Sequence, residues 1–110
     1  MRLSSELWVQ AFIRRCNAAG APAFIMRRGD DERGAIYVKV ALLDGRAKLF
    51  GPAPAGLSET TAVRLLTAHL DPEGAPEREV DAYLARQVDF DPDLWLVEIE
   101  DRAGRSFLED

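Results

Sequence analysis

The sequence predicts an α+β fold: a mainly antiparallel sheet of four to five strands with two helices packed on one face. Three observations support this fold class. Two segments carry apolar residues at helical spacing, several short runs are apolar or alternate with a period of two, and an Asp-Gly turn joins two of these runs. The length of 110 residues fits a single domain over residues 1–110.

The first predicted helix covers residues 5–19. Ser4 or Ser5 can cap its amino end, and Gly20 ends it. One stripe of this helix is apolar and should face the core: Trp8, Val9, Phe12, Ile13, Cys16 and Ala19. Because Cys16 is the only cysteine, no intrachain disulfide can form, and we expect a buried structural thiol.

The second predicted helix opens at Pro76 and stops before Pro92. Proline is favoured at the first helical position, and the residue before a proline avoids the helical region. Glu77 and Glu79 complement the positive end of the helix dipole. The buried side of this helix should carry Val80, Tyr83, Leu84 and Gln87.

Short apolar runs between turn signals give the predicted strands, which are residues 23–28, 35–43, 46–50, 94–100 and 105–108. Residues 58–70 are ambiguous, because Ser58 could cap a helix while the threonines that follow permit a strand. The strand at 94–100 begins apolar on both faces, as an interior strand does. Trp95 should therefore pack against the helix layer, and Phe90 and Trp95 should anchor the two ends of the turn between them.

The Asp44-Gly45 pair predicts a two-residue hairpin turn. That turn length places Lys39 opposite Phe50 and Val40 opposite Leu49. With this register, one face of the hairpin is apolar and belongs to the core. The opposite face carries basic residues among aromatics: Tyr37, Lys39, Arg46, Lys48 and Phe50.

This outer face is the candidate binding surface. Basic residues interleaved with aromatics can bind single-stranded nucleic acid or a small molecule, form a subunit interface, or lie in solvent with their stems on the sheet. Nucleic acid is disfavoured, because the net charge is −5. We therefore expect a non-catalytic interaction or accessory module whose partner is a second copy or another protein. The alternative is a small-molecule or nucleic-acid binder that uses this face.

Catalytic and metal signatures are weak in this sequence. His69 is the only histidine, so a Ser-His-Asp or Cys-His site would have to use it. Gly29 and Gly34 flank acidic residues, which would repel a phosphate group. Asp91 and Asp93 bracket Pro92, a pattern that turn formation explains. We expect no catalytic residue, no metal and no cofactor.

Several motifs together are characteristic of one family. They are Arg27-Arg28-Gly29-Asp30, Val38-Lys39-Val40 with Asp44-Gly45, Val80-Asp81-Ala82-Tyr83-Leu84, and above all Phe90-Asp91-Pro92-Asp93-Leu94-Trp95. With them the chain resembles the alphaproteobacterial domain of unknown function 1491 over nearly its whole length. The resemblance implies a small bacterial protein of unassigned role, and it favours a strand at 60–69.

The expected location is the cytoplasm. The single cysteine suits a reducing compartment, and the N-terminal apolar run is too short and interrupted for a signal peptide. No stretch approaches the ~18 apolar residues of a membrane span, so we expect no membrane partner.

Overall fold

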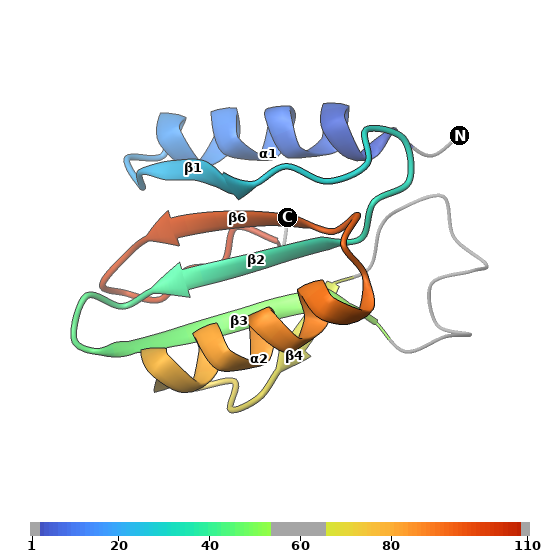
Figure 1. Cartoon of the computed structure of the whole chain (residues 1–110). Coiled ribbons are helices and arrows are strands. Elements are labelled where there is room, and N and C mark those ends of the chain that lie inside the picture. Colours follow the sequence, from blue (N-terminus) through green and yellow to red (C-terminus); the bar gives the residue numbers. More distant parts are fainter. Residues whose placement is uncertain (1–2, 54–65, 109–110) are drawn as a thin grey trace.

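The computed structural model describes residues 3–53 and 66–108, and Figure 1 shows their arrangement. The elements in chain order are α1 (Ser5–Ala18), β1 (Ala23–Arg27), β2 (Ile36–Ala41), β3 (Arg46–Pro52), β4 (Leu66–His69), β5 (Ala75–Pro76), α2 (Glu77–Phe90) and β6 (Trp95–Glu100). The strand order is β1-β6-β2-β3-β4, with the short β5 on β3. Every pairing is antiparallel except β2 with β6. The α+β class is confirmed, and the described sheet has six strands because β5 and β4 both join it.

The two helices cover opposite faces of the sheet, so the expectation that both pack on one face is wrong. Alternate residues of β2 show this directly. Val38 packs in one cluster with Val9 and Phe12 of α1. Tyr37, its neighbour along the strand, packs in the other with Val80 and Leu84 of α2. Adjacent strand residues point to opposite faces, and all six residues of β2 are buried, so this strand is covered on both sides.

The β2–β3 hairpin differs from its predicted register by one residue. Its loop has three residues, Leu43 to Gly45, and the Leu42 amide donates to the Arg46 carbonyl to close it. Leu43 and Gly45 both adopt positive φ angles, of 64° and 90°. Lys39 therefore pairs with Leu49 rather than with Phe50. A slip of one residue turns every side chain of β3 to the other face.

The apolar pattern could not fix this register because both faces of the hairpin are buried. Ala47 and Leu49 lie on the α2 side, where they pack with Val80 and Leu84. Phe50 lies on the other side, against the α1 cluster. Either register gives β3 apolar residues on the side of a helix, so alternation alone does not separate them.

The predictions for residues 58–70 and 105–108 have different outcomes. Leu66–His69 is a strand, as expected for the end of the ambiguous stretch, while residues 58–65 lie outside the described residues. Residues 105–108 are not a strand, which corrects that prediction. They fold back on the α1 side instead, where the Arg15 guanidinium donates to the Phe107 carbonyl.

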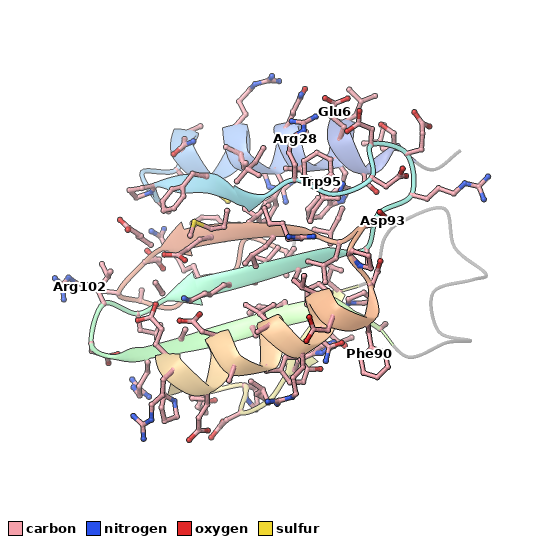
Figure 2. The ribbon with its side chains drawn as sticks, in the orientation of Figure 1. Glu6, Arg28, Phe90, Asp93, Trp95 and Arg102 are labelled. Carbon is pink, nitrogen blue, oxygen red and sulfur yellow. The ribbon has the colours of Figure 1, made fainter. Side chains whose placement is uncertain are left out.

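The centre of the α1 side is as predicted. Trp95 is fully buried on interior strand β6, in one cluster with Phe12, and its indole Nε1 donates to the Asp30 carbonyl at 2.7 Å. Cys16 is also fully buried, and burial raises the pKa of its thiol against the smaller opposing effect of Arg15. Phe90 is not an anchor, which corrects that prediction: 88% of its surface is exposed. Figure 2 shows it pointing away from the sheet at the end of α2.

Candidate functional site

The five residues predicted to share a basic face do not share one. Tyr37 and Lys39 lie on the α2 side of β2, while Lys48 and Phe50 pair with residues on the α1 side. Arg46 is at the exposed hairpin end, where its guanidinium binds the Asp44 carboxylate at 3.0 Å. This dispersal follows from the three-residue loop, because the predicted face depended on a two-residue loop.

Lys39 is buried with only 5% of its surface exposed, and carboxylates surround it. Its Nζ lies 2.8 Å from oxygens of Glu77 and Asp81 and 3.6 Å from Glu98. Burial on its own would lower the pKa of Lys39, but hydrogen bonds to Asp81 and Glu77 outweigh it and the pKa is raised. This lysine is fully engaged within the chain and is not available to an external anion.

Glu98 is the least exposed carboxylate of this group, with 13% of its side chain exposed. Burial raises its pKa, and the neighbouring Lys39 opposes that rise without cancelling it. Although Glu98 is in ion-pair range of Lys39, the lysine is closer to Glu77 and Asp81 on α2. The arrangement ties α2 to the sheet through Lys39 and leaves Glu98 with incomplete compensation for its burial.

His69 and two tyrosines form a second polar group on the α2 side. The Pro52 carbonyl can only accept, so His69 Nε2 carries a proton and donates to it at 3.1 Å. His69 Nδ1 lies 2.6 Å from the Tyr83 hydroxyl. Tyr37 meets the His69 ring edge-on, and its hydroxyl is 3.4 Å from Gln87. Both ring nitrogens of His69 are therefore occupied by structural partners.

A small hollow of about 140 Å³ lies where the loop after β1 meets the turn before β6. It is lined by Asp30, Arg33, Gly34, Ala35, Asp91 and Asp93. Gly34 permits the close approach, because a Cβ there would overlap the Asp93 carbonyl and come within 2.8 Å of the Trp95 ring. The Asp30 carboxylate accepts from the amides of its own turn, and Asp91 accepts from the Asp93 amide. Within residues 3–53 and 66–108, no three metal-ligating side chains are grouped closely enough to hold an ion.

The β1 edge of the sheet is the most exposed apolar surface among the described strands. Phe24, Ile25 and Met26 follow one another along it and expose 38%, 37% and 53% of their surface. β1 pairs only with β6, so its other edge has no neighbouring strand in the described chain. Three consecutive exposed apolar residues on an edge strand are what soluble proteins generally avoid unless the strand has a partner.

The backbone of β1 presents one open pairing position at this edge. The Glu100 amide donates to the Pro22 carbonyl, and the register continues through Ala23 with Ile99, Phe24 with Glu98, and Ile25 with Val97. Bonded and non-bonded pairs alternate in an antiparallel ladder. Phe24 therefore bonds to β6, whereas the amide and carbonyl of Ala23 and of Ile25 point outward.

Asn17 of α1 covers the first of these outward positions. Its Oδ1 accepts from the Ala23 amide at 3.1 Å, and its Nδ2 donates to the Ala23 carbonyl at 3.4 Å. The side-chain amide thus occupies the place of a neighbouring strand. Ile25 has no such cover from the described residues, and a register shift after it ends the regular ladder. One rung of the edge is left open.

Arg27 is the last residue of β1 and Arg28 follows it, and the two arginines differ in their partners. Arg28 binds Glu6 at 2.9 Å and Asp31 at 3.2 Å, and it lies over the Trp95 ring, as Figure 2 shows. Arg27 donates to the Pro92 carbonyl at 2.7 Å, and no carboxylate of the described residues pairs with it. Its Nε is buried without an acceptor.

The family model described as "Protein of unknown function (DUF1491)" matches residues 3–109. The chain belongs to this family. The resemblance that its motifs indicated is confirmed, and the description assigns no activity. No curated protein matches the sequence.

Solved DUF1491 structures share the fold. A crystal structure of a family protein from Caulobacter crescentus is 40% identical, covers 98% of this chain and 94% of its own, and superposes with a TM-score of 0.80. An NMR structure of a DUF1491 protein from the same organism is 41% identical over 100% of this chain and 96% of its own, with a TM-score of 0.80. A solution structure of an A. tumefaciens protein is 41% identical, covers 92% of this chain and 87% of its own, and has a TM-score of 0.77.

The β1 edge of this DUF1491 chain was missed from the sequence, although one signal pointed to it. Residues 23–26 are uniformly apolar, and such a run fits an interior strand as well as an edge strand. Position within the sheet decides between them, and the order β1-β6-β2 depends on a parallel pairing distant in sequence. The Arg27-Arg28 pair directly after the run is the local feature that an edge strand favours.

Proposed function

We propose that this DUF1491 protein is a non-catalytic interaction module of the cytoplasm that binds a partner protein along the β1 edge of its sheet. The observation that carries the proposal is the open rung at Ile25 between two exposed apolar side chains, Phe24 and Met26. Strand addition at such an edge gains backbone hydrogen bonds and side-chain burial together. Neither described helix is long and apolar enough to cross a membrane.

The two functions expected from the basic face lose their main support. A small-molecule or nucleic-acid binder would need Tyr37, Lys39 and Phe50 on one surface, and they lie on two. A homodimer that buries Tyr37 is equally without support, because α2 already covers that residue within one chain. The non-catalytic part of the proposal is supported by His69, whose two nitrogens are held by Tyr83 and Pro52.

The test uses charge at the edge. A Phe24→Lys/Met26→Lys double variant places two like charges on β1 and should weaken partner binding, and because both positions are exposed the fold should be kept. Leu7→Lys is the matched control, because Leu7 is also exposed, at 53%, but lies on α1 rather than on β1. Tagged proteins would be used to capture partners from extracts of a bacterium that contains a DUF1491 protein, and each captured protein would then be purified and its Kd measured.

The expected result is a purified partner that binds the parent and the Leu7→Lys control alike and binds the double variant at least about tenfold more weakly. Circular dichroism of all three proteins would verify that they fold. If every purified partner binds the double variant as tightly as the parent, the edge is not the binding surface and the proposal fails.

A further inference from the structure

We propose, building on the function proposed above, that the occupant of the β1 edge is an extended segment of another protein that carries a carboxylate. Its backbone pairs with Ile25, its apolar side chains cover Phe24 and Met26, and its carboxylate binds Arg27. Two independent features of β1, one in the backbone and one in a side chain, lead to this chemistry.

The backbone feature favours a segment in an extended conformation. A paired strand supplies a carbonyl and an amide together to the outward groups of Ile25, and it also continues along the edge beside Phe24 and Met26. Asn17 already occupies the position at Ala23, so the segment enters beside this amide and runs toward the end of β1. The contact is short, and side chains must therefore contribute much of its specificity.

The side-chain feature is the unmatched charge of Arg27. A guanidinium has five N–H donors, and one of them is accounted for by the Pro92 carbonyl. The hydrogen bond to the Pro92 carbonyl holds the side chain in place without neutralising its charge, and Nε is buried without an acceptor. Arg28, the next residue, has two carboxylates. A planar guanidinium held beside an apolar strand matches a carboxylate in geometry and charge.

A second copy of the chain fits this edge less well. Two-fold antiparallel pairing centred on Ile25 would place Arg27 opposite Ala23 of the other copy, where Asn17 blocks the rung. β1 reads Ala-Phe-Ile-Met-Arg and contains no acidic residue, so the pairing strand would bring no carboxylate to Arg27. The unmatched cation therefore favours a different chain.

The experiment is a selection from a library of random ten-residue peptides against the parent protein, followed by Kd measurement for enriched peptides. Three variants are then compared: Arg27→Gln, Ile25→Pro, and the double variant Phe24→Lys/Met26→Lys. Ile25→Pro removes an outward amide together with the Ile25 side chain, while Phe24 keeps the ladder to β6. Arg33→Gln is the matched control, since Arg33 is an exposed arginine beyond the edge. The same samples are run through size exclusion with light scattering.

The proposal expects enriched peptides that share one acidic position. Arg27→Gln should weaken the binding of these peptides about tenfold, and replacing the acidic residue of the peptide by glutamine should have the same effect. Arg33→Gln should leave the binding unchanged. In isotope-labelled protein, the NMR signal of the Ile25 amide should shift when the peptide binds. If Ile25→Pro fails to fold, the double Lys variant and the Ile25 shift still decide the matter.

The contrary outcomes separate the two proposals. Peptides that bind at the edge without a shared acid, or equally well to Arg27→Gln, overturn the inferred occupant and leave the edge as a binding surface. Self-association that the double Lys variant abolishes also overturns it, in favour of a second copy. If no peptide is enriched and the parent stays monomeric, or if the enriched peptides bind all variants alike, the edge itself is rejected and the proposed function fails with it.

Discussion

The two faces of the sheet are both covered by a helix, yet they are held by different interactions. The α1 side is an apolar cluster in which Phe12 and Trp95 are fully buried. The α2 side has apolar residues as well, but Lys39 and the His69–Tyr83 pair lie among them. A polar residue on a strand therefore does not identify a solvent-facing side, because a helix that brings carboxylates can cover a lysine.

The largest effect should come from the apolar side. Trp95→Ala removes the largest fully buried side chain and should lower the free energy of unfolding by ~3–5 kcal/mol. Phe90→Ala, in the same sequence run, is the control and should change it by less than ~0.5 kcal/mol. Urea denaturation followed by circular dichroism measures both. Equal losses for the two variants would contradict the assignment of Trp95 to the core and Phe90 to the surface.

The polar side should show a smaller effect that depends on pH. Lys39→Met leaves the partly buried Glu98 without its cation and should cost ~1–3 kcal/mol at neutral pH, less than a fully buried pair because Glu77 and Asp81 are substantially exposed. The pKa of Glu98 is raised, so the folded state holds that proton more tightly than the unfolded chain does. Stability contributed by the protonated form is lost as pH rises through the folded pKa.

The cost of Lys39→Met should accordingly shrink as pH falls and Glu98 becomes protonated. Denaturation curves of parent and variant at several pH values between neutral and mildly acidic conditions measure this. Lys48→Met is the matched control, because Lys48 contacts the Gly104 carbonyl rather than a carboxylate. A cost that does not change with pH would contradict the role given to the ionised Glu98.

The apolar side was largely predictable from the sequence. The stripe of α1 was correct in its buried members Val9, Phe12 and Cys16, and the run at 94–100 correctly indicated an interior strand. These predictions depend on periodicity within a single element. Local pattern is enough there, because a helix with one apolar stripe or a strand that is apolar on both faces has few alternatives.

The polar side and the site were not predictable in the same way. The face of Lys39 depended on the length of one loop, and Leu43 adopts a positive φ that its residue type does not favour. The edge position of β1 depended on the parallel pairing of β2 with β6. Loop conformation and non-local pairing are both set by the whole fold, so composition and spacing around these residues could not reveal them.

α1 also differs from α2 in protecting an edge of the sheet. Asn17→Ala removes two hydrogen bonds to Ala23 and should cost ~1 kcal/mol. It also opens a second outward rung beside Ile25, so we expect association that rises with protein concentration. Size exclusion with light scattering detects it, and Gln10→Ala on the same helix is the control. A variant that stays monomeric at all concentrations would show that Asn17 does not guard the edge.

The smallest effect concerns the ion pair that holds the chain where it turns back over the α1 side. The Asp101 carboxylate binds the Arg105 guanidinium at 2.8 Å and accepts from the Arg105 amide at 2.7 Å. The hydrogen bond from the Arg105 side chain, against the opposing effect of desolvation, lowers the pKa of Asp101. Asp101→Asn should therefore cost about 0.5–1 kcal/mol at neutral pH, because Arg105 is half-exposed and solvent screens the charge.

The pH window of this loss distinguishes it from the loss at Lys39. A lowered carboxyl pKa contributes stability that is present above the unfolded value, about 3.9 for aspartate, and is lost as pH falls through the folded pKa. The cost of Asp101→Asn should stay constant from neutral pH down to about pH 4 and disappear only below it. The raised pKa of Glu98 places the change for Lys39→Met at higher pH. Denaturation of the two variants at the same series of pH values measures both windows. If both costs changed over the same pH range, the assignment of one window to Asp101 and the other to Glu98 would be wrong.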